Sequence, residues 1–329
     1  MIEKRRIGDS NIEVAPLALG GNVFDWTADE TTSFAILDAF VDAGGTMIDT
    51  ADVYSAWVPG HRGGESEMVI GRWLKRDPKK RDKVIIATKV GFLDGEIVDG
   101  EYVANLDPQV VMRACDASLQ RLGVERIDLY YQHRDNPAVP LDQSLEAFQR
   151  LREDAKIRTI GLSNFTGPRI DAAASVADRL GITAPVALQP CYNLMERDGY
   201  EAALRPAAER QRLGVFPYYG LANGFLTGKY RSKADLDKSP RGRRIVGYLE
   251  GKGMRVLAAL DEIAAETGAP LAAISLAWLM AQPTIVAAIA SATSVAQLQQ
   301  LTPAMALKLS DDQLARLDQA SSDAEPAAG

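Results

Sequence analysis

The 329-residue sequence predicts an α/β protein built as a (β/α)8 TIM barrel, with an N-terminal hairpin plug and a long loop after strand seven. Short apolar runs rich in β-forming residues alternate with amphipathic helical stretches, which implies parallel strands covered by helices. Eight such units fit a closed barrel in a chain of this length. The expected strands are residues 16–21, 46–50, 84–90, 127–133, 158–163, 186–190, 214–219 and 285–291.

The helical stretches between these strands carry apolar residues at the spacing of one buried face. The segment from Asp107 to Gly123 begins with an aspartate cap and Pro108 and ends at a glycine, as helices often do. An open doubly wound sheet is the alternative fold, but it usually carries G-x-G-x-x-G after its first strand, and the sequence has no such match. The expected helices are residues 30–43, 107–121, 141–154, 166–180 and 198–212.

Three segments lie outside the eight units. Residues 2–14 have the pattern of a small hairpin with its turn near Gly8–Asp9, placed to plug one end of the barrel. Residues 220–252 form a long connection rich in glycine and basic residues, and such connections are usually functional or disordered. Residues 320–329 are small and polar, so we expect a disordered tail after a single domain that spans residues 1–319.

Composition excludes several classes of function. A net charge of −7 and a pI near 5.1 argue against a nucleic-acid partner, because phosphates require a cationic face. The two cysteines, Cys115 and Cys191, cannot form a disulfide framework, and the N-terminus lacks the apolar run of a signal peptide. The uncharged stretch 267–306 is interrupted by prolines, so "PLAAISLAWLMAQ" predicts a buried helix rather than a membrane span. We therefore expect a cytoplasmic protein with no membrane partner.

Polar side chains gather where the expected strands end. The carboxyl ends of barrel strands are where enzymes of this architecture place their chemistry, and a purely structural barrel has no need of polar groups there. The sequence therefore predicts a site at this barrel end. The residues are Asp49 and Tyr54 after strand two, Lys89 at strand three, His133 at strand four, Ser163 and Asn164 at strand five, Gln189 at strand six and Tyr218 at strand seven.

Four of these side chains together make an acid catalyst for a carbonyl group. The phenol of Tyr54 can donate a proton to a carbonyl oxygen, but its ordinary pKa near 10 makes it a weak acid. An ammonium such as Lys89 lowers the pKa of a nearby phenol, and Asp49 would keep that ammonium charged and in position. His133 can hydrogen-bond the same oxygen. Asp52, in the same "IDTADVY" segment, is expected to be a solvated or loop-capping acid.

The motifs around these residues resemble those of the aldo-keto reductases over nearly the whole chain. The resemblance implies a (β/α)8 barrel, often a monomer, that uses NAD(P)H and no metal. It also implies a catalytic tetrad of Asp49, Tyr54, Lys89 and His133, with direct hydride transfer to a carbonyl carbon and Tyr54 as the proton donor. The motifs are "GGTMIDTADVY", "GGESEMVIGRWL", "VIIATKVG", "IDLYYQH", "IRTIGLSNF", "QPCYNLMER" and "LANGFLTGKY".

The same resemblance implies a set of cofactor-binding residues. Ser163, Asn164 and Gln189 correspond to the groups that hold the nicotinamide carboxamide, and Tyr218 to the aromatic side chain that stacks on the ring. The remaining expected cofactor residues are Gly20 and Gly21 after strand one, Leu221, Gly224, Leu226, Gly228 and Lys229 in the pyrophosphate loop, and Ser291, Thr293 and Gln297 after strand eight.

Two departures from the family pattern concern the cofactor. Tyr219 and Gly220 follow the stacking tyrosine where the family usually has Ser-Pro. The stretch "IASATSVAQLQQL" contains no cation, although the family usually holds the adenosine 2′-phosphate there with Lys or Arg. Lys229, Arg231, Lys233 or an arginine of "PRGRR" in the long loop are candidates to replace that cation. We expect NADP on family grounds, and NAD stays open.

The substrate is the least determined part of the prediction. Val23, Trp26 and Trp57, with Phe24, lie on loops after strands one and two, and they predict a pocket for an apolar or aromatic carbonyl compound; ordinary loop packing is the alternative. The expected function is reduction of an aldehyde or ketone. The alternatives are an alcohol or sugar dehydrogenase that uses the same site in reverse, and a cofactor-binding regulatory subunit.

Overall fold

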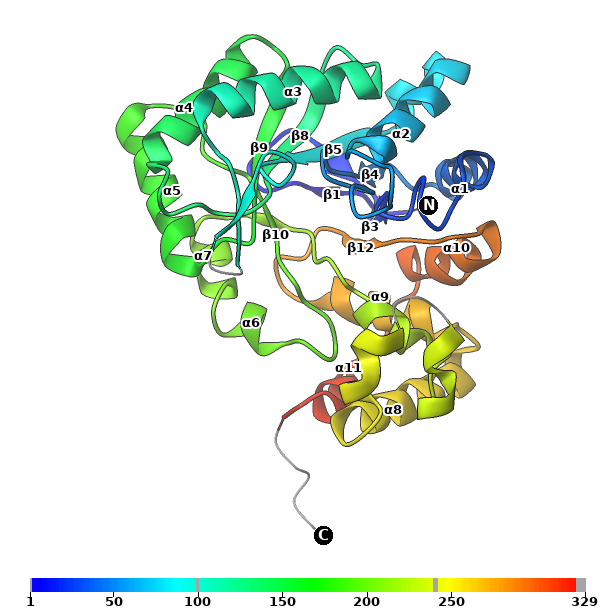
Figure 1. Cartoon of the computed structure of the whole chain (residues 1–329). Coiled ribbons are helices and arrows are strands. Elements are labelled where there is room, and N and C mark those ends of the chain that lie inside the picture. Colours follow the sequence, from blue (N-terminus) through cyan, green and yellow to red (C-terminus); the bar gives the residue numbers. More distant parts are fainter. Residues whose placement is uncertain (1, 99–100, 239–241, 324–329) are drawn as a thin grey trace.

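A computed structural model describes residues 2–98, 101–238 and 242–323. Eight parallel strands form one sheet in the order β11-β10-β9-β8-β5-β4-β3-β12, and Figure 1 shows helices around it. The predicted fold class is confirmed. The strands are β3 (Leu17–Gly20), β4 (Met47–Asp49), β5 (Ile85–Val90), β8 (Ile127–Gln132), β9 (Ile157–Ser163), β10 (Ala187–Gln189), β11 (Gly214–Val215) and β12 (Ala288–Ala290).

Backbone contacts between the two edge strands close the sheet into a barrel. Val215 forms a parallel bridge with Ile285, and the N–H of Val286 donates to the carbonyl of Val215 at 2.9 Å. Further along, the N–H of Ile289 donates to the carbonyl of Pro217 at 2.9 Å. At its other side β12 pairs with β3, so none of the eight strands of this sheet has a free edge in the described part of the chain.

The helices pack on the outside of the barrel, since the strands are buried on both faces. The predicted helix over residues 198–212 is interrupted, because Pro206 lacks an N–H and its ring clashes with the preceding turn. The helices are α1 (Glu30–Asp42), α2 (Glu65–Arg76), α3 (Pro108–Leu122), α4 (Leu141–Glu153), α5 (Gly167–Leu180), α6 (Asp198–Glu201), α7 (Arg205–Arg210), α8 (Lys252–Thr267), α9 (Leu271–Ala281), α10 (Val295–Leu301) and α11 (Asp311–Ala320).

The N-terminal hairpin plugs the barrel as predicted. Strands β1 (Arg5–Arg6) and β2 (Glu13–Val14) pair antiparallel, and the side chains of Ile7 and Ile12 join the apolar cluster that fills the barrel interior. Gly8 has φ +47°, and a Cβ there would lie 2.3 Å from the carbonyl oxygen of Val186. The hairpin turn therefore sits against the chain that enters β10, which places the plug at the amino ends of the strands.

The long connection after β11 is folded into short turns. Three 3-10 segments, η2 (Ala222–Thr227), η3 (Lys233–Lys238) and η4 (Gly242–Tyr248), lead into α8, and η2 packs on α9. A second small hairpin, β6 (Glu96–Val98) with β7 (Glu101–Val103), was not predicted from the sequence. Two more 3-10 segments are η1 (Pro78–Lys83) and η5 (Thr302–Met305).

No single helix in the described ranges is both long and apolar enough to cross a bilayer. Only α8 and α9 taken together, across a 100° bend, pass that test of length and composition. The α9 segment is buried along most of its length, as the sequence predicted.

The predicted disordered tail is wrong for residues 320–323. Ala320 ends α11, Ser321 is buried, and Asp323 forms an ion pair with Lys252. Residues 324–329 lie outside the described part of the chain. Polar contacts of the backbone and side chain of Ser321 hold this segment in place, and sequence composition does not reveal such contacts.

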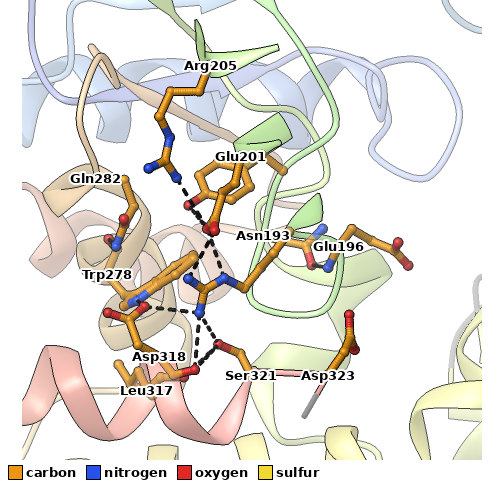
Figure 2. Close-up of polar contacts among 12 residues, drawn as sticks. Asn193, Glu196, Glu201, Arg205, Trp278, Gln282, Leu317, Asp318, Ser321 and Asp323 are labelled. Carbon is orange, nitrogen blue, oxygen red and sulfur yellow. Dashed lines mark hydrogen bonds and ion pairs between the residues drawn. The ribbon is translucent and has the colours of Figure 1, made fainter. Parts of the chain in front are cut away.

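These contacts belong to a network centred on Arg197. Its guanidinium donates to both carboxylate oxygens of Glu201, at 2.8 and 3.2 Å, to Ser321 Oγ at 2.8 Å, and lies 3.1 Å from Asp318 Oδ1. The guanidinium carbon also lies 5.2 Å from the ring centroid of Trp278. Figure 2 shows Glu201, Asp318 and Ser321 converging on this point, so the network ties the loop after β10 to α9 and α11.

Candidate active site

A cavity of ≈ 890 Å³ opens at the carboxyl ends of the barrel strands. Most of the residues predicted for the site line it, and Lys89, Gly21, Leu226 and Gly228 do not. The predicted residues that line it are Gly20, Val23, Trp26, Asp49, Tyr54, Trp57, His133, Ser163, Asn164, Gln189, Tyr218, Leu221, Gly224, Lys229, Ser291, Thr293 and Gln297.

The two-residue period of the strands brings the polar groups together. Met47, Ala87 and Leu129 point into the barrel interior and pack in its apolar cluster. Two residues further along β4 and β5, Asp49 and Lys89 therefore point inward at the barrel mouth, above the apolar layers.

Lys89 lies at the centre of this polar layer. Its Nζ donates to Asp49 Oδ1 at 2.6 Å, to the carbonyl of Thr50 at 2.7 Å and to Tyr54 Oη at 3.0 Å. The Lys89 side chain is completely buried and its Nζ lies 4.8 Å from the ring centroid of Tyr54. Lys89 therefore stands behind the phenol, which faces the cavity.

Burial and charge act in opposite directions on these groups. Burial opposes the charge of Lys89, but Asp49 and Tyr54 outweigh it, so the pKa of Lys89 is raised. For Tyr54, burial raises the pKa more than Lys89 lowers it, and the net shift is upward from 10. Lys89 lowers the pKa of Tyr54 as the sequence predicted, but burial outweighs it, because a buried phenolate loses its hydration.

His133 follows β8 and lies beside the phenol. The ring centroids of Tyr54 and His133 are 6.1 Å apart. The backbone N–H of His133 donates to the backbone carbonyl of Val90 at 2.9 Å. Burial, followed by the charges of Lys89 and Arg134, lowers the pKa of His133 well below its ordinary value. The imidazole is therefore neutral near pH 7, and a neutral ring can still donate one hydrogen bond.

The predicted carboxamide group forms one connected set. Ser163 Oγ donates to the carbonyl of Gln189 at 2.9 Å, and Tyr218 Oη donates to Asn164 Oδ1 at 2.8 Å. Asn164 Nδ2 donates to the carbonyl of His133 at 2.8 Å. Gln189 Nε2 donates to Asp49 Oδ2 at 2.8 Å, so the second oxygen of that carboxylate is also satisfied. This set links the tetrad to the wall formed by β9 and β10.

The two glycines after β3 have different surroundings. Gly20 lines the cavity, and a Cβ there would lie 2.5 Å from Ser291 Oγ. Gly21 instead packs against α2, since a Cβ would lie 2.8 Å from Ser66 Oγ, and its N–H donates to the carbonyl of Asp49 at 2.7 Å. Gly21 therefore supports the Asp49 segment rather than the cavity wall.

The loop after β11 contributes two lysines to the cavity. Lys229 was predicted, and Lys238 was not; Lys238 Nζ donates to the carbonyl of Lys229 at 3.0 Å. Arg231 points away and binds Asp261 with two hydrogen bonds, at 2.6 and 2.8 Å. Lys233 faces Glu250 at 3.6 Å and does not line the cavity.

Two predicted loop residues do not line the cavity. Leu226 is fully buried in the core, and Gly228 ends η2 with φ +76°. Tyr219, at the departure from the family pattern, has φ +56°, and its carbonyl accepts from Asn193 Nδ2 at 3.1 Å. Tyr219 and Gly220 both line the cavity.

The remaining cavity wall is largely aromatic. Trp26 and Trp57 meet edge to face with their ring centroids 5.5 Å apart, and Trp57 is 47 % exposed at the rim. Phe24 is fully buried and belongs to the core, which is the alternative of ordinary loop packing. Phe92, two residues beyond β5, also lines the wall.

Sequence reasoning missed about half of the lining. Phe92 and Arg134 stand just after expected strand ends, and the same strand-end rule would have found them. Residues 270–272 and 300–301 come from helices and carry no polar signal. The missed lining residues are Asn22, Thr27, Phe92, Arg134, Tyr219, Gly220, Asn223, Thr227, Lys238, Pro270, Leu271, Ala272, Ile289, Ala290, Gln300 and Leu301.

Asp52 differs from its expected role. It is 1 % exposed, and neither carboxylate oxygen makes a hydrogen bond of normal geometry with a described residue. Burial, with the nearby charge of Glu67, raises its pKa to about 8, against smaller opposing effects of Arg121 and of backbone N–H groups. Asp52 is therefore a buried acid behind the site and not a solvated cap.

The residues in the cavity fit a phosphate-bearing dinucleotide. The connected hydroxyl and amide groups of Ser163, Asn164 and Gln189 lie at one part of the wall, and Tyr218 offers a ring face beside them. Lys229, Lys238 and Thr293 also line the cavity, and the two lysines supply positive charge there. These are the groups that would hold a carboxamide, an aromatic ring and phosphates.

The chain is similar to known proteins over nearly its whole length. The model of the Aldo/keto reductase family matches residues 16–322. The chain is 32% identical over 319 residues to the uncharacterised oxidoreductase YrpG of Bacillus subtilis (strain 168), covering 96% of this chain and 95% of the relative.

Two further relatives come from Schizosaccharomyces pombe (strain 972 / ATCC 24843). The chain is 29% identical over 328 residues to the aldo-keto reductase yakc [NADP(+)], covering 98% of this chain and 93% of that protein. It is also 29% identical over 334 residues to a putative voltage-gated potassium channel subunit beta, covering 96% and 92%.

Proposed function

We propose that this chain, which belongs to the aldo/keto reductase family and is thus an oxidoreductase, reduces an aldehyde or ketone to an alcohol with NADPH, and that Tyr54 donates the proton. The family in general carries out NAD(P)H-dependent carbonyl reduction. The observation that carries the finer proposal is the 3.0 Å hydrogen bond between Lys89 Nζ and Tyr54 Oη.

The proton donor has the right protonation state for this role. The raised pKa of Tyr54 keeps its phenol protonated at neutral pH, so a proton is always available to a carbonyl oxygen in the cavity. When that proton leaves, Lys89 lies at hydrogen-bond distance from the developing phenolate and stabilises it. Asp49 keeps Lys89 charged, and so the pair acts on the transition state through charge that is already in place.

His133 positions the carbonyl oxygen from the other side. Its neutral ring can donate a hydrogen bond, whereas a charged imidazolium would repel Lys89. The Tyr54 and His133 rings then converge on one oxygen, as two donors of an oxyanion site do. Ser163, Asn164 and Gln189 would hold the cofactor, and the bound cofactor would supply a hydride to the carbonyl carbon.

Two loop lysines support NADPH as the cofactor. The stretch after β12 has no cation, but Lys229 and Lys238 line the same cavity as Ser291, Thr293 and Gln297. Lys238 Nζ also lies 2.7 Å from Asp235 Oδ1, so Lys229 supplies the less compensated charge. A charged donor binds phosphate more strongly than a neutral hydroxyl does. The loop after β11 thus takes the role that the family usually gives to the segment after strand eight.

The test is the initial rate of reduction of a reactive aromatic aldehyde, followed by loss of absorbance of the reduced nicotinamide. NADPH and NADH are used in separate assays, and the alcohol with the oxidised cofactors gives the reverse direction. We expect reduction, with NADPH preferred. Cofactor that binds without turnover of any aldehyde or alcohol would contradict the proposal and favour a cofactor-binding regulatory subunit instead.

A further inference from the structure

Arg134 is a cation in the cavity wall whose charge has no acidic partner among the described residues. It follows His133 at the end of β8, is partly buried, and lines the cavity. Its guanidinium carbon lies 5.5 Å from the ring centroid of Phe92. Its Nε atom is buried and makes no hydrogen bond to any residue that the structure describes.

The adjacent acid is already bound elsewhere. Asp135 accepts two hydrogen bonds from Arg169, at 2.6 and 2.8 Å, so it does not neutralise Arg134. Asp49 is the one carboxylate among the described residues of the cavity wall, and Lys89 and Gln189 occupy its oxygens. Arg134 is therefore left as an uncompensated positive charge beside the reacting groups.

An unpaired guanidinium in a partly desolvated place is costly, because it has lost water without gaining a partner. Its position over the Phe92 ring leaves its hydrogen-bond donors unused. A planar fork of N–H donors matches the two oxygens of a carboxylate. The structure thus offers a preformed partner for an anion that is not part of the protein.

Arg134 belongs to the substrate side of the cavity. The Phe92 ring that it covers lies 4.3 Å, centroid to centroid, from the ring of His133, and the His133 ring lies 6.1 Å from that of Tyr54. The two lysines assigned to the cofactor phosphates are joined to each other on a different loop. The aromatic wall formed by Trp26 and Trp57 faces the same space.

We infer that Arg134 selects carbonyl substrates that carry a carboxylate on an apolar or aromatic body, with the anion bound by the guanidinium while the carbonyl lies at Tyr54. This inference rests on the proposed function and names its substrate class. It makes Arg134 a specificity residue, and it makes the reaction the reduction of an oxo-acid to a hydroxy-acid.

The test compares two aldehydes that differ only in charge, 4-carboxybenzaldehyde and its neutral methyl ester. The wild-type enzyme should have the higher kcat/KM with the acid. In Arg134→Met, which keeps the packing on Phe92, the ratio of kcat/KM for acid over ester should fall roughly 10- to 100-fold, mainly through KM for the acid. Arg134→Lys should give an intermediate ratio. Arg113→Met removes an exposed arginine on α3 and is the matched control, for which the ratio should not change.

A binding measurement keeps the inference separate from the proposed function. Titration with 4-(hydroxymethyl)benzoate, followed by tryptophan fluorescence, should show affinity in the wild type and a loss of roughly tenfold or more in Arg134→Met. If no aldehyde is reduced, the proposed function fails and this titration alone decides the role of Arg134. Equal affinity in the two proteins overturns the inference.

Two kinetic outcomes would also overturn it while leaving the proposed function intact. One is a wild-type enzyme that reduces the ester as well as the acid, with an unchanged ratio in Arg134→Met. The other is a variant that loses both aldehydes equally and has a raised KM for NADPH, which would assign Arg134 to the cofactor.

Discussion

Lys89 Nζ lies 2.6 Å from Asp49 Oδ1, and both side chains are almost completely buried at the mouth of the barrel. A buried ion pair of this kind contributes little net stability, but removal of one partner leaves the other charge without compensation. The pair therefore supports the chemistry of Tyr54 although it adds little stability, and the predictions below begin with it.

Lys89→Met should lower the free energy of unfolding by about 3–5 kcal/mol, because Asp49 remains buried and charged. The double variant Lys89→Met with Asp49→Asn should recover at least half of that loss, since no charge is then buried. Neither protein should reduce aldehydes, because both lack the ammonium beside Tyr54. Urea unfolding and initial rates measure the two effects; a double variant as unstable as the single one would contradict this reading of the pair.

Tyr54→Phe should lower kcat for reduction by roughly 10²- to 10⁴-fold, the usual contribution of a general acid, and should still bind cofactor. Tyr130→Phe is the matched control, because the Tyr130 hydroxyl is buried outside the cavity and has no partner among the described residues. It should keep wild-type rates. Cofactor titration and stopped assays measure both properties, and turnover that survives Tyr54→Phe would remove the proposed proton donor.

The pH profile of reduction should be flat across neutral pH. The pKa of Tyr54 is raised above 10, so the phenol keeps its proton up to that range, and the pKa of His133 is far below 6.5, so the imidazole stays neutral. We expect kcat/KM to change by less than about threefold between pH 6.5 and 9 and to fall above pH 10. A bell-shaped profile centred near pH 7 would show that one of these two shifts has the wrong direction.

Lys229→Met and Lys238→Met should each raise KM for NADPH by roughly three- to tenfold, since both lysines are exposed and their interactions with phosphate are partly screened by water. KM for NADH should rise less if the contact is with the 2′-phosphate. Lys233→Met, on the same loop but outside the cavity wall, is the control and should match the wild type. Equal losses with both cofactors would instead assign the lysines to the pyrophosphate.

Asp52→Asn should stabilise the protein increasingly as the pH rises. The folded-state pKa of about 8 lies above that of an unfolded Asp, so the carboxyl costs nothing extra below about pH 4 and destabilises the fold progressively as pH rises toward 8. The stability difference between variant and wild type should grow by on the order of 1 kcal/mol per pH unit across that window. Urea unfolding at several pH values measures it. Asp82→Asn, at an exposed aspartate, is the control for the change of residue type.

Arg197→Met should lower the free energy of unfolding by about 2–4 kcal/mol, because Glu201 and Asp318 both lose their partly buried partner. Arg210→Met removes an exposed pair with Asp171 and should cost less than about 1 kcal/mol. Thermal unfolding compares them. Equal effects would mean that the network in Figure 2 is no stronger than a surface ion pair.

The sequence predicted those residues of the site that stand at the carboxyl ends of strands. Asp49, Lys89 and His133 stand at the inward positions of β4, β5 and β8, and a two-residue period places them together once the barrel is assumed. Arg134 and Phe92 also follow strand ends, but each stands one residue out of phase with the inward positions, so the two-residue period does not predict them. Lys238 could not be placed, because a flexible stem on a long loop leaves no pattern in the sequence.

By itself the sequence determined the order of strands and helices, the barrel, the plug and the residue types of the tetrad. Hydrophobic periodicity and strand ends depend on residues that are close together in the chain, so short segments reveal them. Only the tertiary structure decided which charges are paired. Arg231 is neutralised by Asp261, Asp135 by Arg169, and Arg134 is left to the cavity. The sequence predicts a solvated acid at Asp52, but the fold buries it beside Glu67 of α2. Burial and ion pairing depend on residues far apart in the chain, and these two properties set the pKa values and the free charges on which the function depends.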